Sequence, residues 1–279
     1  MKGPLLLKVQ GLSRTFGGLA ALQEVDLELG ADEILGLIGP NGAGKTTLFN
    51  LISGLLKPDR GKVVFREKDL TGLPPHQISA QGIARTFQNV RIFPEMTVLE
   101  NLMLGRHTRT RAGLLAALLK LDRKEERLTR EFCLDLLKKI GLAERAPEPA
   151  ANLPFGKMRL LEIGRALAAQ PKLLLLDEPA AGLNHSETDQ LAETIQGIRD
   201  QGLAIIVVEH DMRLVMEISD RVVVLNQGRK IAEGAPREVQ NHPEVIAAYL
   251  GENPGQGPFP RAGNPAPAAS ASGPDQGNA

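Results

Sequence analysis

Cysteine, aromatic residues and an excess charge of either sign are scarce in this sequence. Its 279 residues include one cysteine, one tyrosine and no tryptophan, and 33 basic residues balance 33 acidic ones. The single cysteine, Cys133, excludes an internal disulfide, and its apolar helical surroundings predict a buried structural thiol in a reducing compartment. The zero net charge gives no reason to expect nucleic acid as a partner.

Long apolar runs are missing as well. A membrane-spanning helix needs roughly 18–20 apolar residues, and the first residues lack the basic, apolar and small-residue layout of a signal peptide. We therefore expect a cytosolic chain that reaches a membrane only through other chains. The apolar residues 113–119 are too few to cross a bilayer. The basic residues 106–111 before them are interpreted as a solvated face, with anionic lipid as the less favoured partner.

The most informative stretch is a glycine-rich loop that fits the phosphate-binding pattern G-x-x-x-x-G-K-[ST] without a mismatch. An apolar run at 34–38 predicts a buried strand before it, and residues 45–52 predict a helix after it. Glycines let backbone N–H groups surround an anion, and the helix N-terminus adds partial positive charge. The sequence therefore predicts a nucleoside triphosphate site, and a glycine turn beside an incidental lysine is the alternative. The loop residues are Gly39, Pro40, Asn41, Gly42, Ala43, Gly44, Lys45, Thr46 and Thr47.

Two side chains of the loop have expected roles, and one aromatic residue outside it does too. Lys45 is expected to reach the β- and γ-phosphates, and the Thr46 hydroxyl is expected to hold Mg²⁺. Phe16, followed by two glycines in a chain with few aromatic residues, is a candidate for stacking on the adenine ring. Ordinary loop packing is the alternative for Phe16.

Two carboxylates follow the apolar run at 173–176. Asp177 and Glu178 stand at its C-terminal end, where the ligands of a parallel sheet collect. We expect Asp177 to complete a Mg²⁺ shell through water and Glu178 to polarise the water that attacks the γ-phosphate. Solvated charges at the end of a strand are the alternative.

An imidazole and an amide end two further predicted strands. His210 follows the apolar run at 203–208, and Gln88 ends a strand predicted at 83–87. We expect His210 to contact the γ-phosphate, with a structural histidine as the alternative. Gln88 can offer its amide to Mg²⁺ or to water.

The order of the elements predicts an α/β protein in which helices interrupt the strands. Residues 5–10 and 25–29 predict a small antiparallel β subdomain, and residues 97–170 are mostly helical. Continuous apolar runs then predict a parallel sheet covered on both faces, and these runs are 173–176, 203–208 and 222–225. Proline, glycine and alanine dominate the end of the chain, so residues 253–279 are expected to be a disordered tail.

Capping signals predict where two of the helices begin. Thr97 with Glu100 three residues later is a capping box at the start of the helical region. Ser186 and Asp189 predict the start of a helix between the apolar runs at 173–176 and 203–208.

In this order the motifs resemble those of an ABC-type ATPase. The resemblance covers residues 5–250 and implies a RecA-like P-loop NTPase core, an antiparallel β subdomain and an inserted helical subdomain, within one ATPase domain at residues 1–252. It also implies a head-to-tail dimer in which a signature segment containing Gly156 closes over ATP bound to the other subunit. Phe16 matches the family's adenine-stacking aromatic residue. The matching segments are 39–47 for Walker A, Gln88 for the Q-loop, 153–159 for the signature, 177–179 for Walker B, 181–184 for the D-loop and His210 for the switch histidine.

Within that family the chain is similar to the ATP-binding subunits of branched-chain amino acid importers. The similarity implies an ATP-hydrolysing subunit on the cytoplasmic face of the inner membrane, bound to permease subunits and served indirectly by a substrate-binding protein outside. ATPases of lipopolysaccharide export and of urea or amide import share several of these segments. They are 85–88, 105–115, 161–167, 178–184 and 209–212.

The signature segment departs from the family pattern Leu-Ser-Gly-Gly-Gln. Pro154 and Phe155 replace the serine and the first glycine, and Lys157 replaces the glutamine. Pro154 has neither a hydroxyl nor an N–H for the partner's γ-phosphate, although Gly156 and the helix beginning there can still direct N–H groups at it. We therefore expect a heterodimer in which a second ATPase subunit supplies the better signature.

Two rival interpretations come from other classes of protein. A soluble ABC protein of translation or DNA repair typically carries two ATPase halves or a long coiled-coil insert, and a regulatory module would bind ATP without hydrolysing it. Phe93, Met96 and Leu99 are expected to line a groove for a permease helix, with subdomain core as the alternative interpretation.

Overall fold

Two β-sheets and their covering helices form the protein in a computed structural model, which describes residues 3–86, 88, 91–106 and 123–250. The first sheet is antiparallel, with the strand order β2-β1-β4-β5. In the second sheet, the order is β10-β9-β3-β8-β7-β6; all neighbours are parallel except β9 and β10. The first sheet contains β1 (Leu5–Phe16), β2 (Leu19–Gly30), β4 (Arg60–Phe65) and β5 (Lys68–Asp69). The second contains β3 (Ile34–Ile38), β6 (Ile83–Arg85), β7 (Leu173–Asp177), β8 (Ala204–Val208), β9 (Arg221–Asn226) and β10 (Arg229–Gly234).

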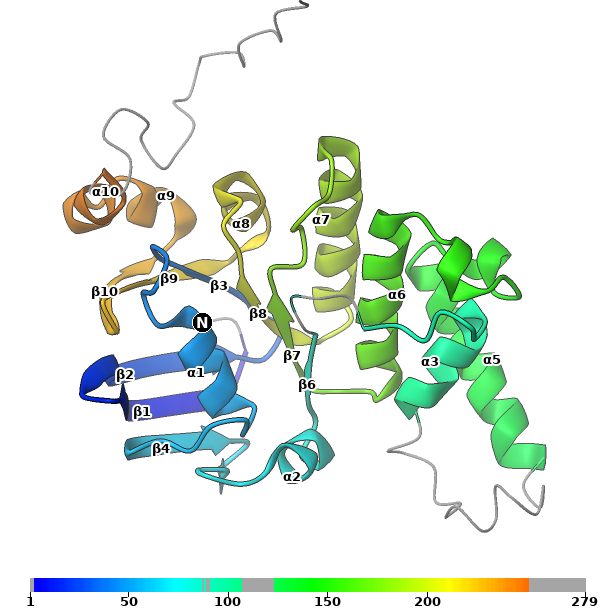
Figure 1. Ribbon diagram of the computed structural model, residues 1–279, viewed down its shortest axis with the longest axis horizontal. Helices are drawn as coiled ribbons and strands as arrows, with labels where there is room; N and C mark the ends of the chain where they lie inside the picture. Colours follow the sequence, from blue (N-terminus) through cyan, green and yellow to red (C-terminus); the bar gives the residue numbers. More distant parts are fainter. Residues whose placement is uncertain (1–2, 87, 89–90, 107–122, 251–279) are drawn as a thin grey trace, which may run out of the picture.

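The helices fall into two groups (Figure 1). A helical group lies at one end of the molecule and contains α3 (Val98–Arg106), α5 (Arg123–Lys139) and α6 (Phe155–Ala168), with the short 3-10 turns η2 (Ala143–Arg145) and η3 (Ala150–Asn152). The other helices lie against or beside the sheets: α1 (Lys45–Ile52), α2 (Pro75–Ala80), α7 (His185–Arg199), α8 (Met212–Ile218), α9 (Pro236–Gln240) and α10 (Pro243–Leu250). In the part of the chain described, none of these helices could cross a membrane.

The central strands are buried on both faces, as their continuous apolar runs predict. All five residues of β3, β7 and β8 are buried. Because successive side chains of a strand point to opposite faces, Leu173 and Leu175 join the core shared with the antiparallel sheet and α1, whereas Leu174 and Leu176 join the core under α6 and α7. The sheet is thus held between two apolar layers, and the carboxyl ends of its strands lie in register.

Three local predictions were wrong. Phe16 is the last residue of β1 rather than a loop residue, because Gly17 and Gly18 form a tight turn that pairs Phe16 with Leu19. The strand before Gln88 ends at Arg85, so Gln88 lies outside it. The capping box of α7 is Asn184 with Glu187, two residues before the predicted one; the extended backbone of Asn184 leaves its side chain free to accept from the Glu187 N–H at 3.0 Å.

The other capping box is confirmed: Thr97 and Glu100 exchange hydrogen bonds at the start of α3. The predicted tail at 253–279, the apolar residues 113–119 and most of the basic residues 106–111 lie outside the described residues.

Cys133 provides a test of the packing between α3 and α5. Its side chain is fully buried, and burial raises the pKa of the thiol to about 11. Because the thiolate is the reactive form, we expect the folded protein at pH 8 to react with Ellman's reagent at least about 100-fold more slowly than the urea-unfolded chain. Equal rates in the two states would contradict the buried position.

Candidate functional site

The phosphate-binding loop is held against its neighbours so closely that two of its glycines cannot be replaced. A Cβ at Gly39 would lie 2.1 Å from the Leu225 carbonyl oxygen, and a Cβ at Gly44 would lie 2.6 Å from that of Ala21. Both residues also have positive φ angles, 150° and 104°, which side chains disfavour. The backbones of β9 and β2 therefore lie directly against the loop at these two glycines and limit its conformation.

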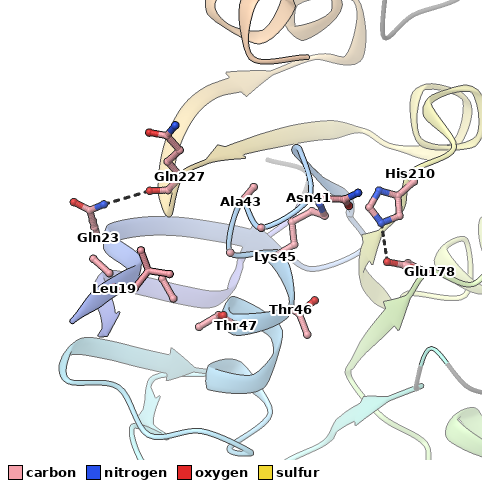
Figure 2. Close-up of a pocket in the computed structure, with 14 residues that line it drawn as sticks. Leu19, Gln23, Asn41, Ala43, Lys45, Thr46, Thr47, Glu178, His210 and Gln227 are labelled. Carbon is pink, nitrogen blue, oxygen red and sulfur yellow. Dashed lines mark hydrogen bonds and ion pairs between the residues drawn. The ribbon is translucent and has the colours of Figure 1, made fainter. Parts of the chain in front are cut away.

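A cavity of about 510 Å³ opens over this loop. Figure 2 shows Lys45 in its middle, with Gln23 and Gln227 toward one end and Glu178 and His210 toward the other. The cavity is lined by Leu19, Ala20, Ala21, Gln23, Asn41, Gly42, Ala43, Gly44, Lys45, Thr46, Thr47, Glu178, His210 and Gln227.

The floor of the cavity suits a polyanion. Helix α1, which the structure describes throughout, has no acidic residue in its first turn, and its N-cap, Gly44, has no side chain that could cap its N–H groups. Its N-terminus can therefore bind an anion. The ammonium of Lys45 is 6% exposed and donates to the carbonyl oxygens of Gly39 and Pro40 at 2.5 and 2.9 Å. A buried cation beside a helix N-terminus favours negative charge in the space above.

Glu178 stands directly after β7 and is contacted on both of its carboxylate oxygens. Gln88 donates from Nε2 to Glu178 Oε2 at 2.8 Å, and His210 Nε2 lies 2.7 Å from Glu178 Oε1. The histidine contact requires a proton on Nε2, because an ionised carboxylate only accepts. Three residues expected from the sequence thus meet at this carboxylate: Glu178 follows β7, His210 follows β8, and Gln88 lies beyond the end of β6.

Asp177 has a different environment. Its carboxylate is buried and forms an ion pair with Arg85, whose Nη2 lies 2.8 Å from Asp177 Oδ2. Arg85 also donates to Asn50 Oδ1 of α1 and to the Oγ of Ser53, the residue that caps the C-terminus of α1. Asp177 does not line the cavity in this structure, so the pairing with Arg85 connects β7 to α1 behind the phosphate-binding loop.

The donor set for a metal is small. Within the described ranges no three His, Cys, Asp or Glu side chains cluster tightly enough to hold an ion by themselves. Mg²⁺ usually keeps several waters and takes one or two protein ligands together with substrate phosphates. The hydroxyl of Thr46 lines the cavity and could serve as one of these few protein ligands. The site therefore fits Mg²⁺ held partly by substrate better than an ion held by protein alone.

Phe16 and Gly156 are not brought to the cavity. Phe16 is 42% exposed and has the Arg14 guanidinium 4.9 Å from its ring centroid, and the cavity is lined instead by Leu19 and Ala20 from the same hairpin. Gly156 lies in α6, where a Cβ would meet Glu187 of α7 at 2.6 Å. Gly156 is therefore buried between α6 and α7 and lies outside this chain's own phosphate site.

The residues expected to line a docking groove differ in burial. Leu99 is 5% exposed and belongs to the core of the helical group, so its subdomain-core interpretation is correct. Met96 is intermediate, and Phe93 is 51% exposed beside the Arg165 guanidinium. Only Phe93 of the three presents a large apolar surface to solvent.

Sequence reasoning missed Glu209, a buried carboxylate next to His210. Its Oε1 accepts from the Ala180 N–H at 2.6 Å and its Oε2 accepts from the His210 N–H at 3.0 Å. It therefore ties the loop after Glu178 to the loop that carries His210. Burial raises the pKa of Glu209, and these backbone donors oppose the rise. The signal in the sequence that could have identified Glu209 is its position directly before His210.

The geometry can now be compared with known proteins. Residues 22–181 match the ABC transporter family, and residues 229–254 match the family described as branched-chain amino acid ATP-binding cassette transporter. The chain belongs to the ABC transporter family. The first of these matches spans the loop and Glu178, so this ABC protein is an ATPase with a P-loop NTPase fold, as its motifs predict.

Curated relatives and solved structures agree with this assignment. Over 250 residues the ABC protein is 50% identical to the high-affinity branched-chain amino acid transport ATP-binding protein LivG of Salmonella typhimurium, covering 88% of this chain and 98% of the relative. BraF of Pseudomonas aeruginosa is 44% identical with the same coverage. An ATP-binding cassette of an ABC transporter in its ADP conformation superposes with a TM-score of 0.79 at 33% identity, covering 89% of this chain and 99% of that one.

The buried carboxylate of Glu209 should make stability depend on pH. Because its folded pKa is raised, its contribution to stability is complete below the ordinary glutamate pKa of about 4.3 and is lost as the pH rises through the folded pKa. We expect Glu209→Gln, which stays neutral, to gain stability relative to the parent as the pH rises from 5 to 8. Urea unfolding at each pH measures this difference.

The matched control for this series is Glu193→Gln on α7, whose side chain is exposed. A difference between Glu209→Gln and the parent that moves in the opposite direction with pH would contradict the assignment.

Proposed function

We propose that this chain hydrolyses ATP as one of the two ATPase subunits of an importer for branched-chain amino acids. The observation that carries the cargo assignment is the 50% identity to LivG over nearly the full length of both chains, together with the match at 229–254. The observation that carries hydrolysis is the carboxylate of Glu178, which faces the phosphate-loop cavity with Gln88 and His210 on its two oxygens.

The cavity accounts for where the nucleotide would bind. Backbone N–H groups of the loop from Gly39 to Thr47 and the ammonium of Lys45 would hold the phosphates. Both the floor of the cavity and the N-terminus of α1 favour negative charge. Phe16 would offer its ring to adenine beside the hairpin residues that line the far end of the cavity. Thr46, Gln88 and Asp177 would hold Mg²⁺, with Asp177 acting through water. Such an ion would offset the negative charge of the phosphates.

Glu178 is the residue we assign as general base. An ionised carboxylate with two donors keeps lone pairs free for a water hydrogen, and its partners fix the direction of those lone pairs. In this structure His210 Nε2–H orients Oε1 and Gln88 orients Oε2. With nucleotide bound, the imidazole of His210 would contact the γ-phosphate in place of its hydrogen bond to Oε1. The carboxylate is 17% exposed, so water can reach it while the protein still limits its motion.

Glu178→Gln tests the base assignment. An amide cannot take a proton from water, so we expect kcat for ATP hydrolysis to fall by about 100-fold or more, while ATP binding is retained because the loop and Lys45 are unchanged. Phosphate release measures kcat and a fluorescent ATP analogue measures binding. A variant that keeps most of its turnover would overturn the assignment.

The partners follow from the signature segment at 153–159 and from the relatives. Pro154 lies at the N-terminus of α6 with no side-chain hydrogen bond to that helix, and it offers nothing to a phosphate. A solved relative at 26% identity and TM-score 0.70 is described as a dimeric ABC cassette. We assign the complete site to a heterodimer at the cytoplasmic face of the inner membrane, docked on permease subunits through a surface that includes Phe93, with a substrate-binding protein engaged on the other side.

The need for a different partner is testable in the isolated chain. Two identical chains would close both ATP sites with the Pro154 segment, so we expect slow hydrolysis by the parent. Pro154→Ser with Phe155→Gly restores the serine and the first glycine of the family pattern, and we expect it to raise the rate of the isolated chain by about 10-fold or more. A parent that hydrolyses ATP as fast as this variant would remove the argument for a heterodimer.

A further inference from the structure

Arg159 is a buried arginine that the nucleotide site just described does not use. It lies one turn into α6, directly behind the exposed signature residues, and is 4% exposed. Burying a guanidinium is costly unless its donors are satisfied with good geometry. Its partners therefore indicate what the position requires.

One short contact of Arg159 leads out of its own helix. Its Nη2 donates to the backbone carbonyl oxygen of Gln88 at 2.6 Å. Its Nη1 lies 3.4 Å from Glu162 Oε2, and Glu162 is 3% exposed, so the guanidinium has a buried counter-charge. The hydrogen bond to Gln88 is charge-assisted and short, which makes it the stronger of the two.

The same Gln88 reaches the reacting carboxylate with its side chain. Gln88 lies outside β6, which ends at Arg85, so no strand hydrogen bonds set its position. Its backbone oxygen is held by Arg159, while its Nε2 donates to Glu178 Oε2 at 2.8 Å. One residue thus joins the signature helix to the general base.

The ring of Phe155 also contacts the guanidinium of Arg159. Its ring centroid is 5.6 Å from the Arg159 guanidinium carbon, an i, i+4 contact along α6. The ring also packs on the loop after Glu178, since a Cβ at Gly182 would lie 3.0 Å from Phe155 Cε1. The aromatic residue that breaks the family pattern is therefore in contact with both the arginine and that loop.

We propose that Arg159 is a positioning residue that holds Gln88 against Glu178, so that the signature helix of this chain adjusts the chain's own catalytic carboxylate. The inference rests on the proposed function, which makes Glu178 the base. In the dimer, the signature segment faces the partner's nucleotide. A shift of α6 on engagement there is transmitted to Gln88 through a single side chain.

The test compares kcat for ATP hydrolysis by the full-length chain, in the assembly that gives turnover, for four proteins. They are the parent, Arg159→Gln with Glu162→Gln, Gln88→Ala, and the combination of all three substitutions. Both charges are removed together because Arg159→Gln alone would take one buried positive partner away from the buried Glu162 carboxylate.

We expect the Arg159/Glu162 pair of substitutions to lower kcat about 10-fold while the KM for ATP changes less than about twofold. In the Gln88→Ala background the same pair should have no further effect, because the side chain through which Arg159 acts is absent. Equal fold reductions in both backgrounds would mean that Arg159 acts structurally, and an unchanged kcat would mean that it does not position Gln88. Either result overturns the inference.

The matched control is Arg145→Gln, which breaks an Arg–Glu pair of the same i, i+3 spacing that is half exposed. It should leave kcat unchanged, and thermal unfolding of every variant checks that each is folded. Glu178→Gln distinguishes a failure of the proposed function from a failure of the role of Arg159. If Glu178→Gln retains turnover, the proposed function fails. If it abolishes turnover and the Arg159/Glu162 substitutions have the same effect with and without Gln88→Ala, only the role of Arg159 fails.

Discussion

The shared burial of β3, β7 and β8 is the constraint on which the rest of the molecule depends. Each of these strands is covered on both faces, so a shift by one residue would exchange the side chains of two apolar cores. Their carboxyl ends are consequently held in register, and every chemical group of the site leaves from that edge. The phosphate loop follows β3, Glu178 follows β7 and His210 follows β8. Hydrophobic packing thus determines the distances between groups that have no apolar character.

Buried charges refine what the packing leaves open. Arg85 joins Asp177 to α1, Arg159 joins α6 to Gln88, and Glu209 joins the loops that carry Glu178 and His210. An ion pair of this kind adds little net stability, because desolvation offsets most of the Coulomb attraction. Its geometry is nevertheless specific, since a misplaced partner leaves a charge unsatisfied. We therefore interpret Arg85, Arg159 and Glu209 as residues that position the segments they join, because the apolar cores do not align these segments by themselves.

The signature segment lacks two hydrogen-bonding groups of the family pattern and gains an aromatic contact within the chain. Pro154 removes a hydroxyl and an N–H that the family pattern provides, and a phosphate on a partner chain would lose those donors. Phe155 adds a ring that packs against the loop at Gly182 and against Arg159. The substitution thus exchanges direct contact with a partner's nucleotide for a closer connection within the chain, which agrees with an asymmetric pair of ATPase subunits.

Local pattern and residue chemistry were enough to predict the α/β class, the phosphate loop, the buried parallel strands and the positions of Glu178 and His210 just after strands, but not the end of the strand before Gln88. The sequence placed Phe16 in a loop and began α7 two residues late, since turn geometry and capping depend on backbone angles that composition leaves open. Four features became visible only in the folded chain: Asp177 pairs with Arg85, Glu209 is buried, Leu99 belongs to the core, and Arg159 donates a hydrogen bond to the backbone of Gln88. Each of these contacts joins residues far apart in the chain or depends on packing around them, and no local pattern encodes which of many possible partners a buried group will meet.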